Sequence, residues 1–316
     1  MTLEKLINMN KFKHFLFKII LFGFSKLPFN NFLALILKYF GISNHKIYKD
    51  LKFSGIFNVI FKQGDKNYQF KMYHFGGYIE NETFWKGLFT TFERESGKIW
   101  MEFSKVSNVI FDIGANTGIY TLVSKSINKD SQIYAFEPSI NTYKKFRKNI
   151  EFNHYKINHF PIALGENDGE QMFYDFKLKN QTSASLSPEK SKGIKEVWEY
   201  KVKTYKLDTF IDEYKISSID LIKIDVEMYE PQVLIGFSTY INKYLPVIFI
   251  EVLTDEVASL IYPLINQRYD IYQLNVNSSI KKVDKFTIVA FVWNYLLIPK
   301  VKQEDYKEII DKFEVK

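Results

Sequence analysis

The chain has 316 residues, of which 46% are hydrophobic and 25% are charged, a composition that excludes a wholly disordered protein. It has no cysteine, which excludes disulfides, thiolate zinc sites and cysteine nucleophiles and fits the reducing cytoplasm. The net charge of +7 comes from residues 1–54, which carry nine lysines and two acidic residues, so the rest of the chain is neutral. Because a nucleic-acid partner requires a basic surface, the neutral body argues against one.

Residues 1–54 are predicted to form a basic, amphipathic helical extension. Their longest unbroken apolar run, residues 19–24, is far shorter than the roughly 20 residues that a membrane-spanning helix needs. On a helical projection the polar side chains share one stripe: Lys11, His14, Lys18 and Ser25. Two interpretations stay open, because such a helix can lie on the anionic inner face of the cytoplasmic membrane or pack on the main domain with its lysines in water.

Residues 55–105 are predicted to lead into the core as a hairpin and a helix. Apolar and polar residues alternate over 56–75 around Gly64 and Asp65, which indicates a β-hairpin. The stretch 82–103 has the pattern of one helix.

Residues 106–300 form the main predicted domain, in which strands and helices alternate. The predicted strands are 108–114, 132–138, 157–165, 219–226, 245–253, 269–274 and 287–298, and the predicted helices are 118–128, 139–153, 230–237 and 255–267. Near-continuous apolar strands that alternate with helices are typical of a doubly wound, mostly parallel sheet covered on both faces. The polar stretch 166–200 is predicted to be a loop, either a cover over the site or a surface excursion, and 301–316 a helical tail.

The first strand of this series ends in a turn rich in small residues, "FDIGANTG", which contains Asp112, Gly114, Asn116 and Gly118. The second strand ends at Glu137, about where an acid pairs with ribose hydroxyls in a nucleotide-binding βαβ unit. Turn, helix, strand and terminal acid in this order predict an adenosine-containing cofactor. The alternative is a tight strand-to-helix turn followed by a solvated glutamate.

The chemistry of the turn discriminates between two such cofactors. A dinucleotide site usually presents G-x-G-x-x-G and a helix N-terminus to a pyrophosphate. Here the turn begins with the carboxylate of Asp112, which would repel a pyrophosphate but suits the ammonium group of a methionine moiety. S-adenosylmethionine is therefore the better fit, and a nicotinamide-dependent oxidoreductase is the alternative.

Seven stretches in this order resemble the FkbM-type S-adenosylmethionine-dependent methyltransferases: "FDIGANTGIYT", "FEPS", "PIALGENDG", "YKLDTFI", "IDLIKIDVEMYEPQVLIG", "FIEV" and "NYLLIPK". Upstream, "IENETFWKGLFTTFERE" is similar to the region that precedes the first motif in that family. The resemblance covers roughly residues 75–300. It implies a class I, Rossmann-like methyltransferase sheet with an antiparallel last strand, and O-methylation of a hydroxyl, commonly of a sugar or a polyketide-type natural product.

The resemblance also implies roles for single residues. It places Asp112, Gly114, Asn116 and Gly118 around the methionine part of the cofactor, Glu137 at the ribose, and Ala163 with Leu164 at the adenine. One position departs from the family pattern V-E-G-x-E, because Met228 stands where glycine is expected. A methionine does not easily adopt a positive φ, so either this position is unstrained or the turn around Glu227 differs.

Acidic residues at the ends of neighbouring strands are the candidates for catalysis. Asp225 and Glu251 end two strands that would converge on one crevice, and either carboxylate could take the proton of an acceptor hydroxyl. Alternatively, Asp225 with Glu227 or Glu251 could hold Mg²⁺. Lys223 could face the acceptor or pair with an acid. Glu230 is expected to stabilise the start of the following helix.

These patterns predict a cytoplasmic O-methyltransferase that acts on a sugar hydroxyl of a surface polysaccharide or a glycolipid precursor. If the extension binds lipid, the enzyme would be peripheral on the inner face of the membrane. Two other functions remain as alternatives: a nicotinamide-dependent oxidoreductase on a Rossmann-like fold, and a non-catalytic adapter that keeps the methyltransferase fold.

Overall fold

The computed structural model describes residues 30–40, 46–49, 51–176, 184–188, 196–275, 277–288 and 292–315. Of the basic extension it describes helix α2 (Asn30–Tyr39) and the short 3₁₀ helix η2 (Lys46–Lys49). The polar stripe predicted for Lys11, His14, Lys18 and Ser25 lies outside the described residues. Among the described helices, none combines the length and the hydropathy that crossing a membrane requires.

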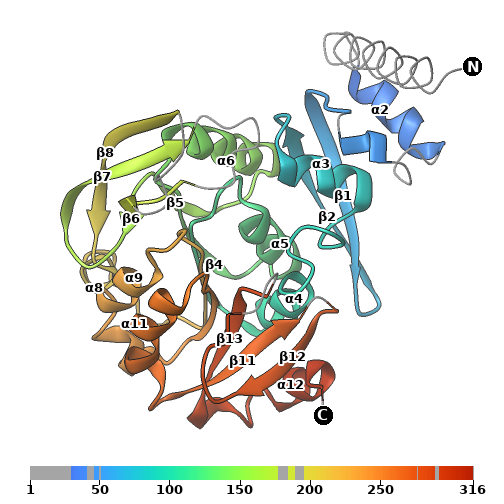
Figure 1. The fold of residues 1–316 in the computed structure, drawn as a ribbon. Helices are drawn as coiled ribbons and strands as arrows, with labels where there is room; N and C mark the ends of the chain where they lie inside the picture. The colour runs from blue at the N-terminus through green and yellow to red at the C-terminus, as the bar shows by residue number, and fades with distance from the viewer. Residues whose placement is uncertain are drawn as a thin grey trace, which may run out of the picture.

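A central sheet organises the main domain (Figure 1). In sheet order its eight strands are β12 (Ser279–Val283), β11 (Tyr269–Asn275), β13 (Asn294–Pro299), β10 (Val247–Glu251), β9 (Leu221–Ile224), β3 (Val109–Ile113), β4 (Gln132–Phe136) and β5 (Asn158–Phe160). Strands β3, β4, β5, β9 and β10 run parallel, whereas β13 runs antiparallel to β10. The doubly wound, mostly parallel sheet with an antiparallel last strand is therefore confirmed.

Helices cover both faces of this sheet because successive strand residues point to opposite sides. Along β3, Ile110 packs into the core under α4 and α5, whereas Phe111 packs into the core under α8 and α9. One face carries α4 (Gly97–Val106), α5 (Ile119–Ile127), α6 (Ile140–Asn153) and α12 (Lys307–Phe313), and the other carries α8 (Leu207–Glu213), α9 (Glu230–Ile235), α10 (Tyr240–Tyr244) and α11 (Asp255–Ile265).

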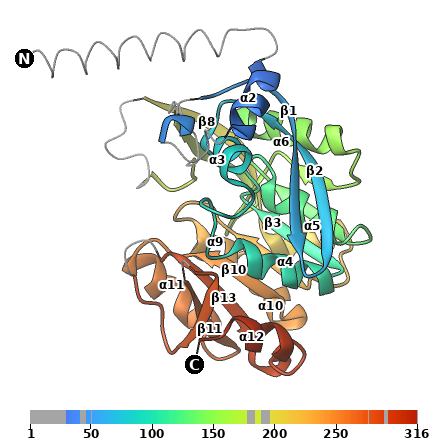
Figure 2. The same ribbon diagram turned by 90° about the vertical axis from the view of Figure 1, so that its right-hand side faces the viewer.

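The predicted hairpin is present as β1 (Gly55–Gln63) and β2 (Lys66–His74), joined by the turn at Gly64 and Asp65. It packs beside α5 and α6 (Figure 2). Two α6 side chains bind the outer edge of β2: Asn149 Oδ1 accepts from Tyr73 N at 2.9 Å, and Asn153 Oδ1 accepts from Lys71 N at 2.7 Å. These bonds satisfy backbone groups that an open sheet edge would leave unpaired.

The single helix predicted over 82–103 is wrong. The structure has α3 (Tyr78–Lys86) and α4, separated by a loop at 87–96. The chain leaves the helix at Gly87, whose φ of 101° belongs to the left-handed region that favours glycine. Within the loop Glu93 also has a positive φ, 50°.

The strand predicted at 157–165 is also wrong, because it is split between two sheets. Strand β5 ends at Phe160, and Pro161, which has no N–H to donate, follows it. The next strand, β6 (Ala163–Leu164), belongs to a separate three-stranded sheet with β7 (Gly169–Phe176) and β8 (Val197–Tyr205). Much of the stretch predicted as a loop is therefore a β-ribbon, and residues 177–183 and 189–195 lie outside the described residues.

Three smaller differences concern the C-terminal third. The sequence did not predict α10 or β12, and the last strand begins at Asn294 rather than near residue 287. The predicted helical tail contains the 3₁₀ turn η3 (Lys300–Lys302) and α12.

Asn149 is fully buried and bridges the hairpin to the loop after β3, because its Nδ2 also donates to Thr117 O at 2.9 Å. The substitution Asn149→Ala leaves a buried N–H and a buried carbonyl without partners, so we expect the free energy of unfolding to fall by about 2 kcal/mol. Urea denaturation measures this loss. The control is Asn153→Ala, whose hydrogen bonds to Lys71 are exposed to water and whose loss should cost less than about 1 kcal/mol. Equal losses would contradict the bridging role.

Candidate active site

A cavity of about 350 Å³ lies at the carboxyl ends of β3, β4, β9 and β10, beneath the loop 87–96. Ligand sites in open α/β sheets lie at this edge, where the strands turn into the following helices. The cavity brings together most of the residues predicted from the sequence: Gly114, Asn116, Glu137, Ala163, Leu164, Lys223, Asp225, Glu227 and Glu251. Asp112 and Gly118 are not part of its wall.

The glycines of the first turn are required by backbone packing. Gly114 has φ +85°, and a Cβ there would lie 1.8 Å from the carbonyl oxygen of Asp225. Gly118 has φ +90° and begins α5, and a Cβ there would lie 2.3 Å from the ring of Phe146 on α6. The turn can therefore lie directly against the end of β9, and this close approach forms one side of the cavity.

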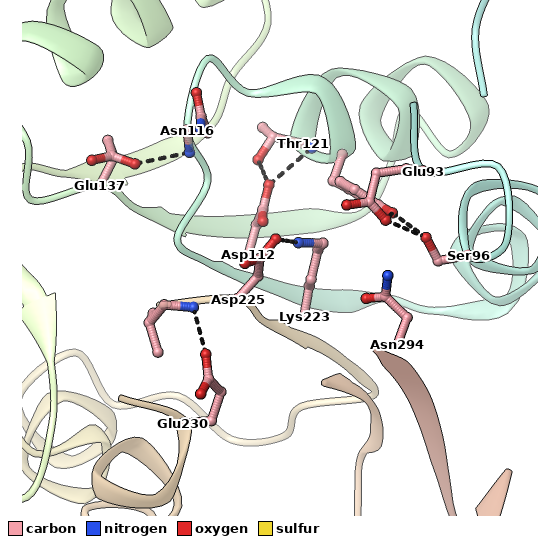
Figure 3. Close-up of polar contacts among 12 residues, drawn as sticks. Glu93, Ser96, Asp112, Asn116, Thr121, Glu137, Lys223, Asp225, Glu230 and Asn294 are labelled. Atoms are coloured by element: carbon pink, nitrogen blue, oxygen red, sulfur yellow. Dashed lines mark hydrogen bonds and ion pairs between the residues drawn. The ribbon is translucent and has the colours of Figure 1, made fainter. Parts of the chain in front are cut away.

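Asp112 is 1% exposed, and its carboxylate stabilises the start of α5 by hydrogen bonds. Its Oδ2 accepts hydrogen bonds from Thr121 N at 3.0 Å and from Thr121 Oγ1 at 2.6 Å (Figure 3). The other oxygen, Oδ1, is buried without a hydrogen-bond partner among the described residues. Asp112 thus anchors the first turn of α5, and its contact with a methionine group stays a prediction.

Glu137 ends β4 and presents its carboxylate to the cavity. Its Oε2 accepts from Asn116 N at 2.9 Å and its Oε1 accepts from Ser139 N at 2.8 Å. Burial raises the pKa of Glu137 to about 8, although the two backbone N–H groups act to lower it. Each carboxylate oxygen keeps a second lone pair, so Glu137 can accept further hydrogen bonds from a diol.

An apolar wall lies on the same side as Glu137. Ala163 and Leu164 of β6 are both buried and line the cavity together with Ile162 and Phe173. Such a wall fits a flat aromatic base, while Glu137 supplies the polar contact that a ribose needs. The described residues therefore fit an adenosyl group at this end of the cavity.

Lys223 lies 4% exposed at the centre of the site. Its Nζ is 2.5 Å from Asp225 Oδ2 (Figure 3). It also lies 4.5 Å from the centroid of the Tyr120 ring. Burial acts to lower the pKa of Lys223, but the carboxylates of Asp225, Glu93 and Asp112 raise it above its ordinary value. Lys223 is therefore charged at neutral pH and pairs with an acid, as one of the two sequence-based alternatives expected.

Three carboxylates converge beside this pair. One oxygen each of Asp225, Glu227 and Glu251 lies within 4.8 Å of the other two. The Oε2 atom of Glu251 is buried and has no hydrogen-bond partner among the described residues. Burial, followed by the charges of Asp225 and Glu227, raises the pKa of Glu251 well above its ordinary value. This carboxyl group is therefore suited to holding a proton.

The turn after β9 shows which backbone conformation Met228 adopts at the position where the family has glycine. Met228 does adopt a left-handed conformation, with φ +76°, and Glu227 before it has φ +57°. The buried carboxylate of Glu230 stabilises this turn, because its Oε1 accepts from Val226 N at 3.1 Å and from Met228 N at 3.3 Å. Burial raises the pKa of Glu230 to about 8. Glu230 thus binds the turn that precedes α9.

Sequence analysis missed two groups that line the cavity. Glu93 Oε2 accepts from Ser96 Oγ at 2.5 Å and from Tyr120 OH at 2.7 Å, and burial raises its pKa. Asn294, at the start of β13, donates to Glu95 Oε1 at 3.1 Å and pairs with Glu251 in the sheet register. The only signal for Glu93 was the similarity of "IENETFWKGLFTTFERE" to a family region, and it named no residue.

Comparison with known proteins identifies the family. The model described as the methyltransferase FkbM domain matches residues 112–289. "Methyltransferase 1" of Beauveria bassiana is 28% identical over 142 residues, which are 40% of this chain and 57% of that protein. "Hexuronic acid methyltransferase AglP" of Haloferax volcanii is 21% identical over 146 residues, which are 46% of this chain and 56% of that protein. The chain thus spans little more than half the length of these curated relatives.

Two solved structures are also similar. A crystal structure of an FkbM methyltransferase from Methylobacillus flagellatus KT has a TM-score of 0.40 at 16% identity, covering 60% of this chain and 43% of that one. An rRNA methylase from Streptococcus thermophilus has a TM-score of 0.37 at 10% identity, covering 62% of this chain and 90% of that one. Since the family model matches more than half of the sequence, this chain belongs to the FkbM methyltransferase family, and its sheet is of the class I, Rossmann-like type.

Proposed function

We propose that this protein is an S-adenosylmethionine-dependent O-methyltransferase that acts on a sugar hydroxyl. The observation that carries the proposal is a single cavity with a diol-accepting carboxylate, Glu137, and an apolar wall at one end and three converging carboxylates at the other. An adenosyl donor fits the first end, and an acceptor hydroxyl that must lose a proton fits the second.

The order of the strands supports this division. Glu137, Gly114, Asp225 and Glu251 end four neighbouring strands, β4, β3, β9 and β10, in that order. Since neighbouring strands lie about 4.8 Å apart, β4 and β10, with β3 and β9 between them, are about 14 Å apart. This spacing leaves room for a nucleoside at one end of the cavity and a second substrate at the other.

When bound, S-adenosylmethionine supplies an electrophilic methyl group on a positively charged sulfur. The walls of the cavity align the acceptor oxygen for an in-line displacement. Glu251 accepts the hydroxyl proton, because its Oε2 has no other partner among the described residues. A positively charged group in the cavity lowers the pKa of Glu251, so that the carboxylate is deprotonated and can accept a proton. When that positive charge is lost, the pKa of Glu251 rises again and the carboxyl group keeps the proton.

A Mg²⁺ ion is the second candidate for activating the hydroxyl. Asp225, Glu227 and Glu251 offer the oxygen ligands that Mg²⁺ prefers. We favour Glu251 as the base, because Asp225 already pairs with Lys223 at 2.5 Å. The two candidates differ in one measurable respect, since only the metal-dependent reaction stops when chelator is added.

The sugar acceptor is supported by one relative, whose name states that it methylates hexuronic acid. A surface polysaccharide or its glycolipid precursor would present sugar hydroxyls to this enzyme. The nicotinamide-dependent oxidoreductase and the non-catalytic adapter are the competing proposals, and the following two experiments separate them.

The first experiment removes the proposed base. Glu251→Gln should lower kcat by about 10²–10⁴-fold and leave the affinity for S-adenosylhomocysteine within about threefold of the original. Because a base must be deprotonated, the activity of the unaltered protein should fall as the pH drops through the raised pKa of Glu251. The pH–activity profile of the variant should lack this fall. Full activity of the Glu251→Gln variant would contradict the assignment, and so would a complete loss of activity when chelator is added to the unaltered protein.

The second experiment removes the proposed ribose contact. Glu137→Ala deletes the hydrogen bonds that its carboxyl group would make to the ribose, so calorimetry should show S-adenosylhomocysteine binding at least about tenfold more weakly. The matched control is Glu170→Gln, an exposed residue on β7 outside the cavity. Binding of NAD in place of S-adenosylhomocysteine would favour the oxidoreductase, and binding of neither would favour the adapter.

We also propose that the N-terminal extension brings the enzyme to the inner face of the cytoplasmic membrane. Helix α2 and the residue after it support this, because they expose apolar side chains and follow the lysine-rich segment in the sequence: Phe32 is 61% exposed and Phe40 is 75% exposed. Apolar side chains flanked by lysines favour an anionic lipid surface.

Vesicle sedimentation tests the membrane proposal. The full chain should bind vesicles that contain phosphatidylglycerol and release them in high salt. Because each lysine near such a surface contributes about 1 kcal/mol, deletion of residues 1–50 should weaken binding by more than about tenfold. Calorimetry with S-adenosylhomocysteine checks that the shortened chain is folded. Unchanged vesicle binding would remove the membrane proposal.

A further inference from the structure

The cavity is strongly acidic. Seven acidic side chains line it among the described residues, against one ammonium group: Glu93, Glu95, Glu137, Asp175, Asp225, Glu227 and Glu251, with Lys223 as the counter-charge. Burial raises the pKa of three of them, Glu93, Glu137 and Glu251, which reduces their negative charge, but the other four still outnumber Lys223. The main domain as a whole is neutral, so this excess of negative charge is local to the site.

Among the described residues, the cation that lines the cavity is Lys223. Its Nζ lies 2.5 Å from Asp225 Oδ2 and 4.5 Å from the centre of the Tyr120 ring, and its side chain is buried. The carboxylates of Asp225, Glu93 and Asp112 all act on this ammonium group, so its positive charge is already offset by the acids around it. Lys223 is therefore a poor partner for a carboxylate on a substrate.

The negative charge is concentrated where the acceptor is proposed to bind. The oxygens of Asp225, Glu227 and Glu251 converge there. Glu95 of the loop 87–96 accepts a hydrogen bond from Asn294 at the start of the neighbouring strand β13. Burial raises the pKa of Glu251, and repulsion from the carboxylates of Asp225 and Glu227 raises it further. A further anion would meet the same repulsion, in a partly desolvated cavity where charges interact strongly.

We infer that the sugar ring accepted by this cavity carries no carboxylate: it is an uncharged ring whose hydroxyls donate hydrogen bonds to Asp225, Glu227 and Glu251. This inference rests on the proposed function. Carboxylates are strong acceptors for hydroxyl donors, so an uncharged ring satisfies them without adding negative charge. Trp293, which lines the same cavity and is 37% exposed, supplies an apolar surface for the ring. The acceptor then differs from the hexuronic acid in the name of the Haloferax volcanii relative.

Matched pairs of sugars test the inference. The full-length protein, saturated with S-adenosylhomocysteine, is titrated with methyl hexosides in the gluco, galacto and manno configurations and with the corresponding methyl hexuronides. Saturation-transfer NMR measures binding, and transfer of labelled methyl from S-adenosylmethionine measures turnover. We expect the best hexoside to bind at least tenfold more tightly than its hexuronide, a difference of about 1.4 kcal/mol.

A charge-removing variant makes the test specific to the cavity. Glu227→Gln keeps the size of the side chain and removes one negative charge, so the hexoside-to-hexuronide ratio should fall several-fold. Glu213→Gln on α8, exposed and outside the cavity, is the control and should leave the ratio unchanged.

Each outcome is decisive. Hexuronides that bind as tightly as hexosides, or a ratio that Glu227→Gln does not change, overturn the inference and leave the methyltransferase proposal standing. Failure of both sugar classes to bind or react, while S-adenosylhomocysteine binds, overturns the sugar acceptor itself and this inference with it. Failure of S-adenosylhomocysteine to bind overturns the proposed function.

Discussion

The ion pair between Lys223, which is buried, and Asp225, which is partly exposed, is the interaction on which the site depends. It lies at the centre of the parallel sheet, where the ends of β3, β9 and β10 meet, and the carboxylates of Asp112 and Glu93 also contribute to the field around the ammonium group. Without Lys223, the acids that line the cavity would have no opposite charge beside them among the described residues. Removing one partner of such a pair typically costs about 3–5 kcal/mol, because the other charge stays buried.

Strand order then distributes the chemistry along the cavity. The nucleoside end lies over β4, where Glu137 is fixed by two backbone N–H groups, and β6 adds an apolar wall from the second sheet. The acidic end lies over β9 and β10. Because parallel strands deliver their carboxyl ends to one edge, residues more than 100 positions apart in sequence share a single cavity. The antiparallel β13 closes the far side and places Asn294 opposite Glu251.

The segment before the family match completes the site. The loop 87–96 separates α3 from α4. It places Glu93 where Tyr120 donates a hydrogen bond to its carboxylate and where its charge acts on Lys223. Ser96 donates a hydrogen bond that holds the Glu93 carboxylate in place (Figure 3), and Tyr120 donates a second. The wall of the cavity is thus built partly from residues that precede the family match at 112–289.

The sequence alone determined the features that have a local pattern. Apolar runs predicted the parallel strands, the spacing of Gly114 and Gly118 predicted the turn, and Glu137, Asp225 and Glu251 were recognisable because each ends such a run. Only the tertiary structure decided which groups meet. Asp112 binds Thr121, β6 joins a different sheet from β5, and Glu93 reaches Lys223, because these contacts depend on pairing between distant segments, which leaves no periodic signal in the chain.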